Sequence, residues 1–126
     1  MPYRILVVDD NEMNRNLVAK ILELEGYLVR VAENGMQAIQ FASQQPPDLA
    51  VLDVMMPDMD GYALCEKLRQ PPFNAGYPIV MLTAMNSEFE RAQADSAGAN
   101  EVWSKPFDVE LFRKRIGELL SASHPV

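Results

Sequence analysis

The sequence is poor in cysteine and in basic residues, and it lacks a long hydrophobic run. Its one cysteine, Cys65, cannot form an internal disulfide, which is typical of a reducing compartment, and its place between Leu64 and Leu68 predicts simple packing. No apolar run approaches the roughly 20 residues that cross a bilayer, and the first residues lead into a strand-like segment instead of a signal peptide. We therefore expect a cytoplasmic protein that does not bind membranes.

The deficit of positive charge also limits the partners. Lys and Arg together number 11, against 18 Asp and Glu, which gives a formal net charge of -7. This charge repels polyanions, so direct nucleic-acid binding is not expected, whereas a metal cation or a basic protein surface would be attracted.

The length and composition predict one folded domain. Two domains in 126 residues would each be smaller than a core usually needs, and 48% hydrophobic with 23% charged residues is ordinary for a globular protein. We expect a single domain over residues 1–126, with its core at about 3–122 and a short polar tail. His124 in this tail is expected to be solvated, without a role in phosphotransfer.

Two periodic patterns alternate along the chain. Short runs rich in β-branched and aliphatic residues predict five strands, at 3–8, 28–32, 49–52, 79–82 and 102–103. Apolar stripes predict two amphipathic helices, one with Leu17, Val18, Ile21 and Leu22 and the other with Phe112, Ile116, Leu119 and Leu120. Weaker patterns predict helices at 35–43, 62–69 and 87–97. The last has a mostly alanine inner face with Phe89 as its large apolar residue, so we expect it to be mobile.

This alternation predicts an α/β fold, a doubly wound parallel sheet of five strands with five helices on its two faces. The first, third and fourth strands are apolar throughout, as expected of central strands buried on both sides. Arg30 interrupts the second strand, and Glu101 and Ser104 flank the fifth, so these two belong at the edges. The predicted order is 2-1-3-4-5, that of a flavodoxin-like sheet.

Polar residues follow four of the predicted strands. Ligands of such sheets bind outside the carboxyl ends of the strands, near the point where the strand order reverses, here between the first and third. Asp9 and Asp10 follow the first strand, Asp53 the third, Thr83 the fourth and Lys105 the fifth. The sequence therefore predicts one site that contains all five residues.

Taken singly, each of these residues has a purely structural explanation. Asp9, Asp10 or Asn11 could begin the first helix as its N-cap, Thr83 could start a loop, and Lys105 could be a solvated charge. Taken together, three converging carboxylates repel by about 4 kcal/mol per close pair at an effective dielectric constant near 20. We therefore expect cations at the site: Lys105 supplies one charge, and Mg²⁺, which prefers oxygen ligands, suits the rest.

Three segments in these places resemble the receiver-domain motifs of response regulators in two-component signal transduction. They are Ile5-Leu6-Val7-Val8-Asp9-Asp10-Asn11, Leu52-Asp53-Val54-Met55-Met56-Pro57-Asp58-Met59-Asp60-Gly61 and Ser104-Lys105-Pro106-Phe107. The resemblance covers roughly residues 3–120, with the segments in the order and at the spacing of the family. It implies a receiver that is either a stand-alone regulator or part of a larger protein.

The resemblance assigns roles around the metal. It implies that Asp53 is the phosphoacceptor, that Asp10 and Asp53 bind Mg²⁺ directly together with the Met55 backbone carbonyl, and that Asp9 binds it through water. Such a domain assists its own phosphorylation and dephosphorylation and is not otherwise an enzyme. Its phosphoryl donor is a sensor histidine kinase, a histidine phosphotransfer protein or a small phosphoanhydride.

The resemblance also implies how the signal leaves the site. The Thr83 hydroxyl and Lys105 would each contact a phosphoryl oxygen, and the bond from Lys105 to Pro106 is typically cis. Phosphorylation would draw Thr83 inward and reposition the neighbouring loop, which begins with Ala84, and helix 87–97. A downstream protein would then bind the face formed by the fourth helix, fifth strand and fifth helix, and the chain would be a monomer or a phosphorylation-dependent dimer.

Two features depart from the family pattern or qualify it. Val102 stands where the family commonly has Tyr or Phe as a switch, which leaves the coupling to the output face open. Neighbouring Trp103 is expected to pack on the edge strand, with an output contact as the alternative. Met55 and Met85 would flank the phosphoryl group, which predicts a moderately long phosphoryl lifetime; loop packing is equally compatible.

Three other functions fit parts of the sequence. An aspartate-nucleophile phosphohydrolase also needs Asp, Thr, Lys and Mg²⁺, but it places its nucleophile after the first strand. A flavodoxin needs a phosphate-binding loop after the first strand, where this chain has an acidic turn. A receiver-like interaction module that is never phosphorylated is favoured only by Val102.

Overall fold

The computed structural model describes residues 2–56, 58–84 and 87–124, in which five strands and five helices alternate. The strands are β1 (Arg4–Val8), β2 (Leu28–Ala32), β3 (Leu49–Asp53), β4 (Ile79–Thr83) and β5 (Glu101–Ser104). The helices are α1 (Glu12–Glu23), α2 (Gly35–Gln44), α3 (Gly61–Arg69), α4 (Glu88–Ala97) and α5 (Val109–Ser123). Every element expected from the sequence is present. Each end of each strand lies at the expected residue or one residue away from it.

The strands form one parallel sheet in the order β2-β1-β3-β4-β5, which confirms the flavodoxin-like topology. The three central strands are buried over almost their whole length, as their apolar composition predicts. β2 and β5 are partly exposed, as expected of edge strands.

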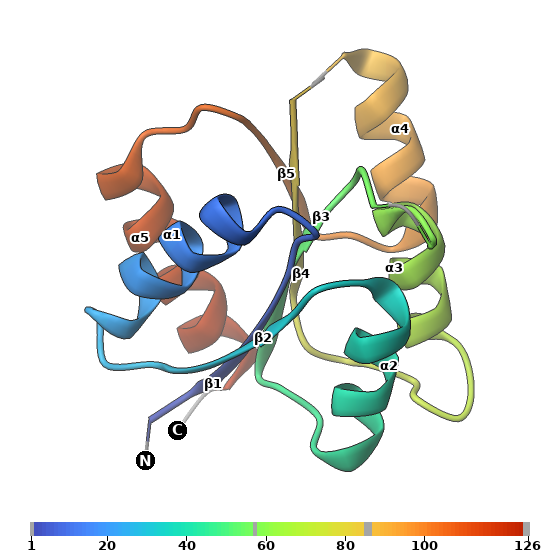
Figure 1. Ribbon diagram of the computed structural model, residues 1–126, viewed down its shortest axis with the longest axis horizontal. Helices are drawn as coiled ribbons and strands as arrows, with labels where there is room; N and C mark the ends of the chain where they lie inside the picture. The colour runs from blue at the N-terminus through green and yellow to red at the C-terminus, as the bar shows by residue number, and fades with distance from the viewer. Residues whose placement is uncertain (1, 57, 85–86, 125–126) are drawn as a thin grey trace.

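Helices cover both faces of the sheet. Figure 1 shows α1 and α5 together on one side and α2, α3 and α4 on the other. Because alternate strand residues point to opposite faces, Ile5 and Val7 belong to the core beneath α1 and α5, whereas Leu6 and Val8 belong to the core beneath α2 and α3. The sheet is therefore anchored by two apolar layers, which leaves its carboxyl edge free for polar residues.

Each helix begins at a residue whose side chain accepts a backbone hydrogen bond from three residues further on. These N-caps are Asn11, Asn34, Asp60, Ser87 and Asp108. Of the three candidates for the first cap, Asn11 has this role, with its Oδ1 accepting from the Asn14 N–H at 3.0 Å. The two aspartates before it are therefore not needed to start α1.

Some side chains lie elsewhere than the sequence pattern predicts. Leu17 of α1 is 58% exposed and Phe89 of α4 is 66% exposed, so neither belongs to its helix's buried face. The buried residues of α4 are Ala94 and Ala97 alone among its described side chains. Periodicity identified the correct faces in general, but it did not distinguish these exposed residues from the buried ones.

His124 is not simply solvated, contrary to expectation. Its Nε2 lies 3.2 Å from Asp48 Oδ1, and its Nδ1 lies 3.0 Å from the Leu120 carbonyl oxygen. Its ring packs 5.2 Å from that of Tyr3. These contacts hold the end of α5 against the start of β1. They lie at the edge of the sheet where the strands begin, opposite to the carboxyl edge.

Candidate functional site

The predicted site residues come from the ends of adjacent strands. Asp9 directly follows β1, Asp53 and Thr83 end β3 and β4, and Lys105 directly follows β5. The register pairs Asp53 with Leu82 and Thr83 with Ser104, so these strands end at nearly the same level. In-register parallel strands therefore deliver all these side chains to one edge of the sheet.

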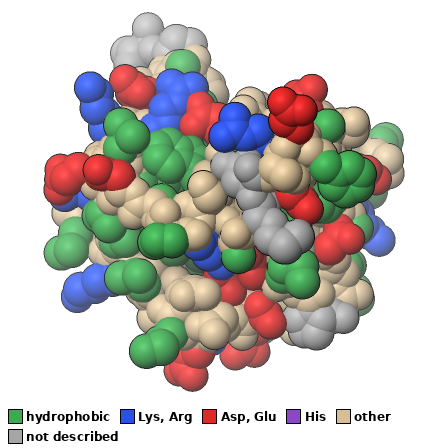
Figure 2. All heavy atoms as spheres, turned by 90° about the horizontal axis from the view of Figure 1, so that it is seen from above, with side chains coloured by type: hydrophobic (Ala, Val, Ile, Leu, Met, Phe, Trp, Pro, Cys, Tyr) green, Lys and Arg blue, Asp and Glu red, His purple; other side chains and the backbone are tan. Residues whose placement is uncertain are grey.

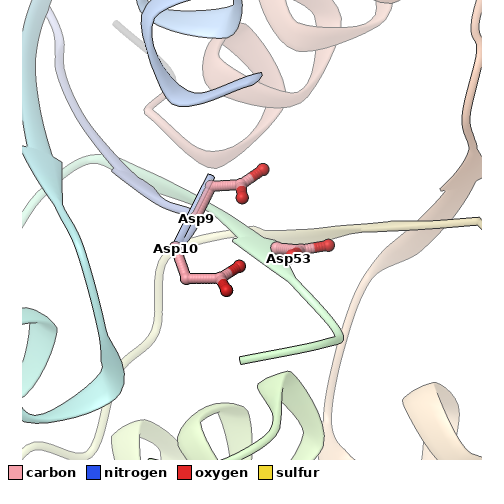
Figure 3. A group of neighbouring side chains, drawn as sticks. All are labelled: Asp9, Asp10 and Asp53. Atoms are coloured by element: carbon pink, nitrogen blue, oxygen red, sulfur yellow. The ribbon is translucent and has the colours of Figure 1, made fainter. Parts of the chain in front are cut away.

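The three aspartates form a compact cluster. One carboxylate oxygen from each of Asp9, Asp10 and Asp53 lies within 4.8 Å of the others. Figure 3 shows Asp9 and Asp10 at the end of β1 and Asp53 at the end of β3, with the three carboxylates extending toward the right of the view. Asp9 and Asp53 are buried, with 2% and 7% of their surface exposed, whereas Asp10 is exposed. The predicted convergence of carboxylates is thus present.

Lys105 lies between two of these carboxylates. Its Nζ is 3.0 Å from Asp53 Oδ1 and 3.4 Å from Asp9 Oδ2, and its side chain is 24% exposed. Burial alone would lower the pKa of Lys105, but the hydrogen bond to Asp53 and the charges of both carboxylates raise it overall. Lys105 is therefore a charged component of the site rather than a solvated surface residue.

Asp53 has an unusual environment for a carboxylate. Burial raises its pKa, and the charges of Asp9 and Asp10 act in the same direction, whereas the hydrogen bond from Lys105 acts in the opposite one. One ammonium group therefore offsets only part of the repulsion among three acids. The site as folded favours the arrival of further positive charge.

The donor atoms of the cluster fit a hard divalent cation. All three groups offer carboxylate oxygens, the ligands that Mg²⁺ prefers, and the cluster contains no His or Cys that would favour zinc among the described residues. The three carboxylates and the one ammonium group together leave an excess of negative charge, which a divalent cation would neutralise. The residues present therefore fit Mg²⁺.

The remaining predicted site residues lie in the places that the strand order requires. Thr83 is buried at 2% exposure, and Ala84 after it is exposed. The Lys105–Pro106 bond is cis, as the resemblance implies. Met55, two residues beyond Asp53, has a side chain that is 69% exposed. Met85 lies outside the described residues.

Val102 and Trp103 face opposite sides of the sheet. Val102 packs beneath α4 against the cluster of Val54, Met81 and Ala94. Trp103 packs edge-on against Phe112 of α5, with ring centroids 5.7 Å apart. Packing on the edge strand, the interpretation preferred for Trp103, is confirmed, and Trp103 does not take the place of an aromatic side chain at position 102.

Asp58 and Gly61 hold the loop after β3 in place. The sequence pattern did not predict this role for either residue. The Asp58 carboxylate accepts the backbone N–H groups of Gly35 at 3.1 Å and Met36 at 3.0 Å, at the start of α2. Burial acts to raise the pKa of Asp58, but these backbone hydrogen bonds lower it overall. An acidic residue at a helix N-terminus is favourable, yet no local signal links position 58 to a helix that begins 23 residues earlier.

Gly61 closes the same loop against the strand. Its N–H donates to the Val54 carbonyl at 2.8 Å. A Cβ at this position would overlap the Asp53 carbonyl oxygen and lie 2.8 Å from Met81 Cε. The first turn of α3 therefore rests directly on the backbone of Asp53.

Arg15 of α1 also lies beside the cluster, although its position in the sequence did not point to the site. It is 8% exposed, and its Nη1 donates to the Asp9 carbonyl at 3.1 Å. The available signal was its spacing of three and seven residues from Val18 and Leu22, which places Arg15 on the buried stripe of its helix.

A five-stranded doubly wound sheet with an acidic cluster and a lysine at its carboxyl edge defines the class of CheY-like signalling domains. Residues 5–117 match the model of the response regulator receiver domain, and the chain belongs to this family. The resemblance inferred from the sequence is confirmed.

Curated relatives agree with this assignment. The DNA-binding dual master transcriptional regulator RpaA of Synechocystis is 39% identical over 117 residues, which are 93% of this chain and 48% of that protein. The response regulator PleD of Caulobacter vibrioides is 40% identical over 119 residues, or 94% of this chain and 26% of PleD. The chain thus spans about half or less of these relatives, and DNA binding is a property of RpaA as a whole.

Solved structures agree over nearly the whole chain. A putative response regulator from Chloroflexus aurantiacus superposes with a TM-score of 0.90 at 35% identity, covering 96% of this chain and 99% of the other. The chemotaxis protein CheY4 of Vibrio cholerae superposes with a TM-score of 0.89 at 29% identity, covering 94% and 99%.

Family membership sets the general function. Receiver domains take part in phosphoacceptor signalling with histidine kinases and are not conventional enzymes. The phosphohydrolase alternative is also disfavoured by topology, because Asp53 ends the third strand. In the part of the chain that the structure describes, no helix is long and apolar enough to cross a membrane.

Proposed function

We propose that this chain is a Mg²⁺-dependent switch in which Asp53 receives a phosphoryl group from a sensor histidine kinase or a histidine phosphotransfer protein. The observation that carries the proposal is the position of Asp53. It is buried at the end of β3, within 4.8 Å of two other carboxylates and 3.0 Å from the Lys105 ammonium group.

The residues available for Mg²⁺ are the acidic cluster and the loop that follows β3. Asp10 and Asp53 would bind it directly together with the Met55 backbone carbonyl, and Asp9 would bind it through water. A bound Mg²⁺ would offset the negative charge on the oxygens of the phosphoryl group during transfer.

The chain's own groups account for the remaining chemistry. A carboxylate oxygen of Asp53 forms the new bond to phosphorus as the bond to the donor's histidine nitrogen breaks. Lys105 exchanges its contact with Asp53 for one with a phosphoryl oxygen, and the Thr83 hydroxyl donates to another. The buried position of Asp53 and Thr83 limits access of water to the new acyl phosphate.

The output would involve α4, β5 and α5. Phosphorylation adds about -1.5 to -2 charges at the edge of the sheet, next to the end of β4 that leads into α4. Figure 2 shows the molecule from above the view of Figure 1, with acidic side chains in several groups and hydrophobic ones scattered between them. We expect a downstream protein to bind the face of α4, β5 and α5 after phosphorylation has rearranged it.

Three further expectations from the sequence stay predictions. They are that the protein is a monomer or a phosphorylation-dependent dimer, that it is cytoplasmic, and that it consists of a single domain.

Phosphotransfer with matched variants tests the proposal. Asp53→Asn should abolish the base-labile label that a phosphohistidine donor transfers to the wild type in the presence of Mg²⁺. Asp95→Asn, which removes an exposed carboxylate from α4 outside the cluster, should be labelled normally. Equal labelling of Asp53→Asn would remove Asp53 from its role, and an unlabelled wild type would favour an interaction module that is never phosphorylated.

A further inference from the structure

Arg15 is a buried cation beside the acidic cluster. Arginine is rarely buried without partners, yet Arg15 is 8% exposed and lies on the same face of α1 as Val18 and Leu22, which contact the core. Its burial therefore requires specific hydrogen bonds, and these determine what it does.

The guanidinium group has two polar contacts with described residues. Nη1 donates to the Asp9 carbonyl oxygen at 3.1 Å, in a buried hydrogen bond. The other terminal nitrogen lies 3.7 Å from Glu33 Oε1, but the Glu33 side chain is 64% exposed. Water screens such a counter-charge strongly, so the contact with Asp9 is the better defined of the two.

The accepting carbonyl belongs to the peptide that joins Asp9 to Asp10. A hydrogen bond to this oxygen fixes the plane of that peptide and therefore the direction in which the Asp10 side chain leaves the backbone. Asp9 itself is held further by its N–H donating to the Ala32 carbonyl at 3.2 Å and by its Oδ1 accepting from the Asn11 N–H at 2.9 Å.

Asp10 depends on this peptide more than Asp9 does. Its side chain is exposed, and its carboxylate has no hydrogen bond or ion pair with the described residues. Among protein groups, its own backbone is therefore the main restraint on its distance from Asp53. A charged donor on the preceding carbonyl restricts that backbone and also brings positive charge toward three carboxylates that repel one another.

We infer that Arg15 is a positioning residue for the metal site: it orients the Asp9–Asp10 peptide and thereby sets the affinity for Mg²⁺. This inference rests on the proposed function. Groups that orient metal ligands without touching the metal typically change its affinity by roughly 10- to 100-fold. We expect the lower end of this range, since Arg15 acts on the backbone of a ligand.

Calorimetric titration with MgCl₂ on the full chain tests the inference. Arg15→Met should weaken Mg²⁺ binding about tenfold. Lys20→Met removes the same charge from an exposed position on the same helix and should bind Mg²⁺ as the wild type does. Asp53→Asn reports on the site itself and should lose most of the binding.

A second measurement needs no metal. The Asp10 amide belongs to the peptide that Arg15 orients, so its ¹⁵N–¹H resonance in the metal-free protein should move in Arg15→Met and stay in place in Lys20→Met. If Arg15→Met does not fold, Arg15→Lys replaces it, because one ammonium group cannot reproduce the guanidinium contacts. Arg15→Lys should also bind Mg²⁺ more weakly than the wild type.

The outcomes separate the two claims. Wild-type affinity in the folded Arg15 variant, with binding lost in Asp53→Asn, overturns the role of Arg15 and leaves the metal site intact. An equal loss in Arg15→Met and Lys20→Met shows a general charge effect and also overturns it. Absence of Mg²⁺ uptake by the wild type overturns both the inference and the metal dependence of the proposed function.

Discussion

Helices α4 and α5 both lie beside β5, but they are held in different ways. α5 buries three large side chains, Phe112, Ile116 and Leu120, whereas α4 buries only Ala94 and Ala97 among its described residues. A fully buried Phe, Leu or Ile contributes about 1.5–3 kcal/mol, and a single methyl group only about 0.8 kcal/mol. The face proposed for output thus combines a firmly anchored helix with a weakly anchored one.

Polar contacts supply much of what holds α4. The Tyr62 hydroxyl of α3 donates to the Glu90 carboxylate, and Ser87 and Gly98 terminate the helix at its two ends. Hydrogen bonds of this kind contribute about 1 kcal/mol each, and they can be exchanged for others without opening the core. A change at the carboxyl edge of the sheet should therefore move α4 before it moves α5.

Truncating the core under each helix gives the largest expected difference. Phe112→Ala should lower the free energy of unfolding by about 3–5 kcal/mol, because it leaves a cavity beneath α5. Ala94→Gly, its counterpart under α4, should cost about 1–2 kcal/mol through the lost methyl group and lower helix propensity. Urea denaturation measures both, and equal losses would remove the distinction between the helices.

Hydrogen exchange should show the same difference in the unmodified protein. Central amides of α4 should exchange through local opening at least about tenfold faster than central amides of α5, after correction for intrinsic rates. Mass spectrometry of deuterated peptides from residues 88–97 and 109–123 measures this. Slower exchange in α4 than in α5 would contradict weak anchoring.

The hydroxyl of Tyr62 tests the polar contact alone. Tyr62→Phe should raise the exchange rate of α4 several-fold and leave α5 unchanged, with a loss of overall stability of about 1 kcal/mol. Tyr27→Phe is the matched control, since it removes a hydroxyl near Gly117 of α5. If both variants leave α4 unchanged, the Tyr62–Glu90 contact does not hold the helix.

The pH dependence of this contact is the smallest expected effect. Burial raises the pKa of Tyr62 above its ordinary value, and the hydrogen bond and charge of Glu90 raise it further. Because the folded-state value is the higher one, the stabilisation is fully present below the unfolded-state pKa of about 10 and is lost as the pH rises through the folded-state value. Burial also raises the pKa of Tyr27 and raises that of Tyr77 to about 12, so the wild type must be compared with Tyr62→Phe. Near pH 10 the increase in absorbance at 295 nm on unfolding should be larger in the wild type than in Tyr62→Phe by the contribution of one tyrosine.

The sequence predicted the sheet order and the acidic cluster because both depend on patterns that are local to single strands. Apolar strands identify the centre of the sheet, and the residue after each strand necessarily lies at the carboxyl edge. Asp53 and Lys105 could be placed together for this reason, although they are 52 residues apart.

Such patterns could not predict the contacts between separate elements. The outward position of Phe89 depends on how α4 packs, and the Tyr62–Glu90 contact joins side chains 28 residues apart. Arg15 carried a signal in its helical spacing, but nothing local reveals that its partner is the Asp9 carbonyl. Such contacts depend on the relative placement of layers, which the periodicity of one element does not specify.

The close approach of Gly61 to the strand restricts how this chain can vary. Even alanine there would force β3 or α3 to move, because its methyl group would overlap the Asp53 carbonyl oxygen. That oxygen is the backbone carbonyl of the residue whose side chain is the proposed nucleophile. A substitution that adds only one carbon and two hydrogens, with no change in charge or polarity, is therefore expected to disturb phosphotransfer.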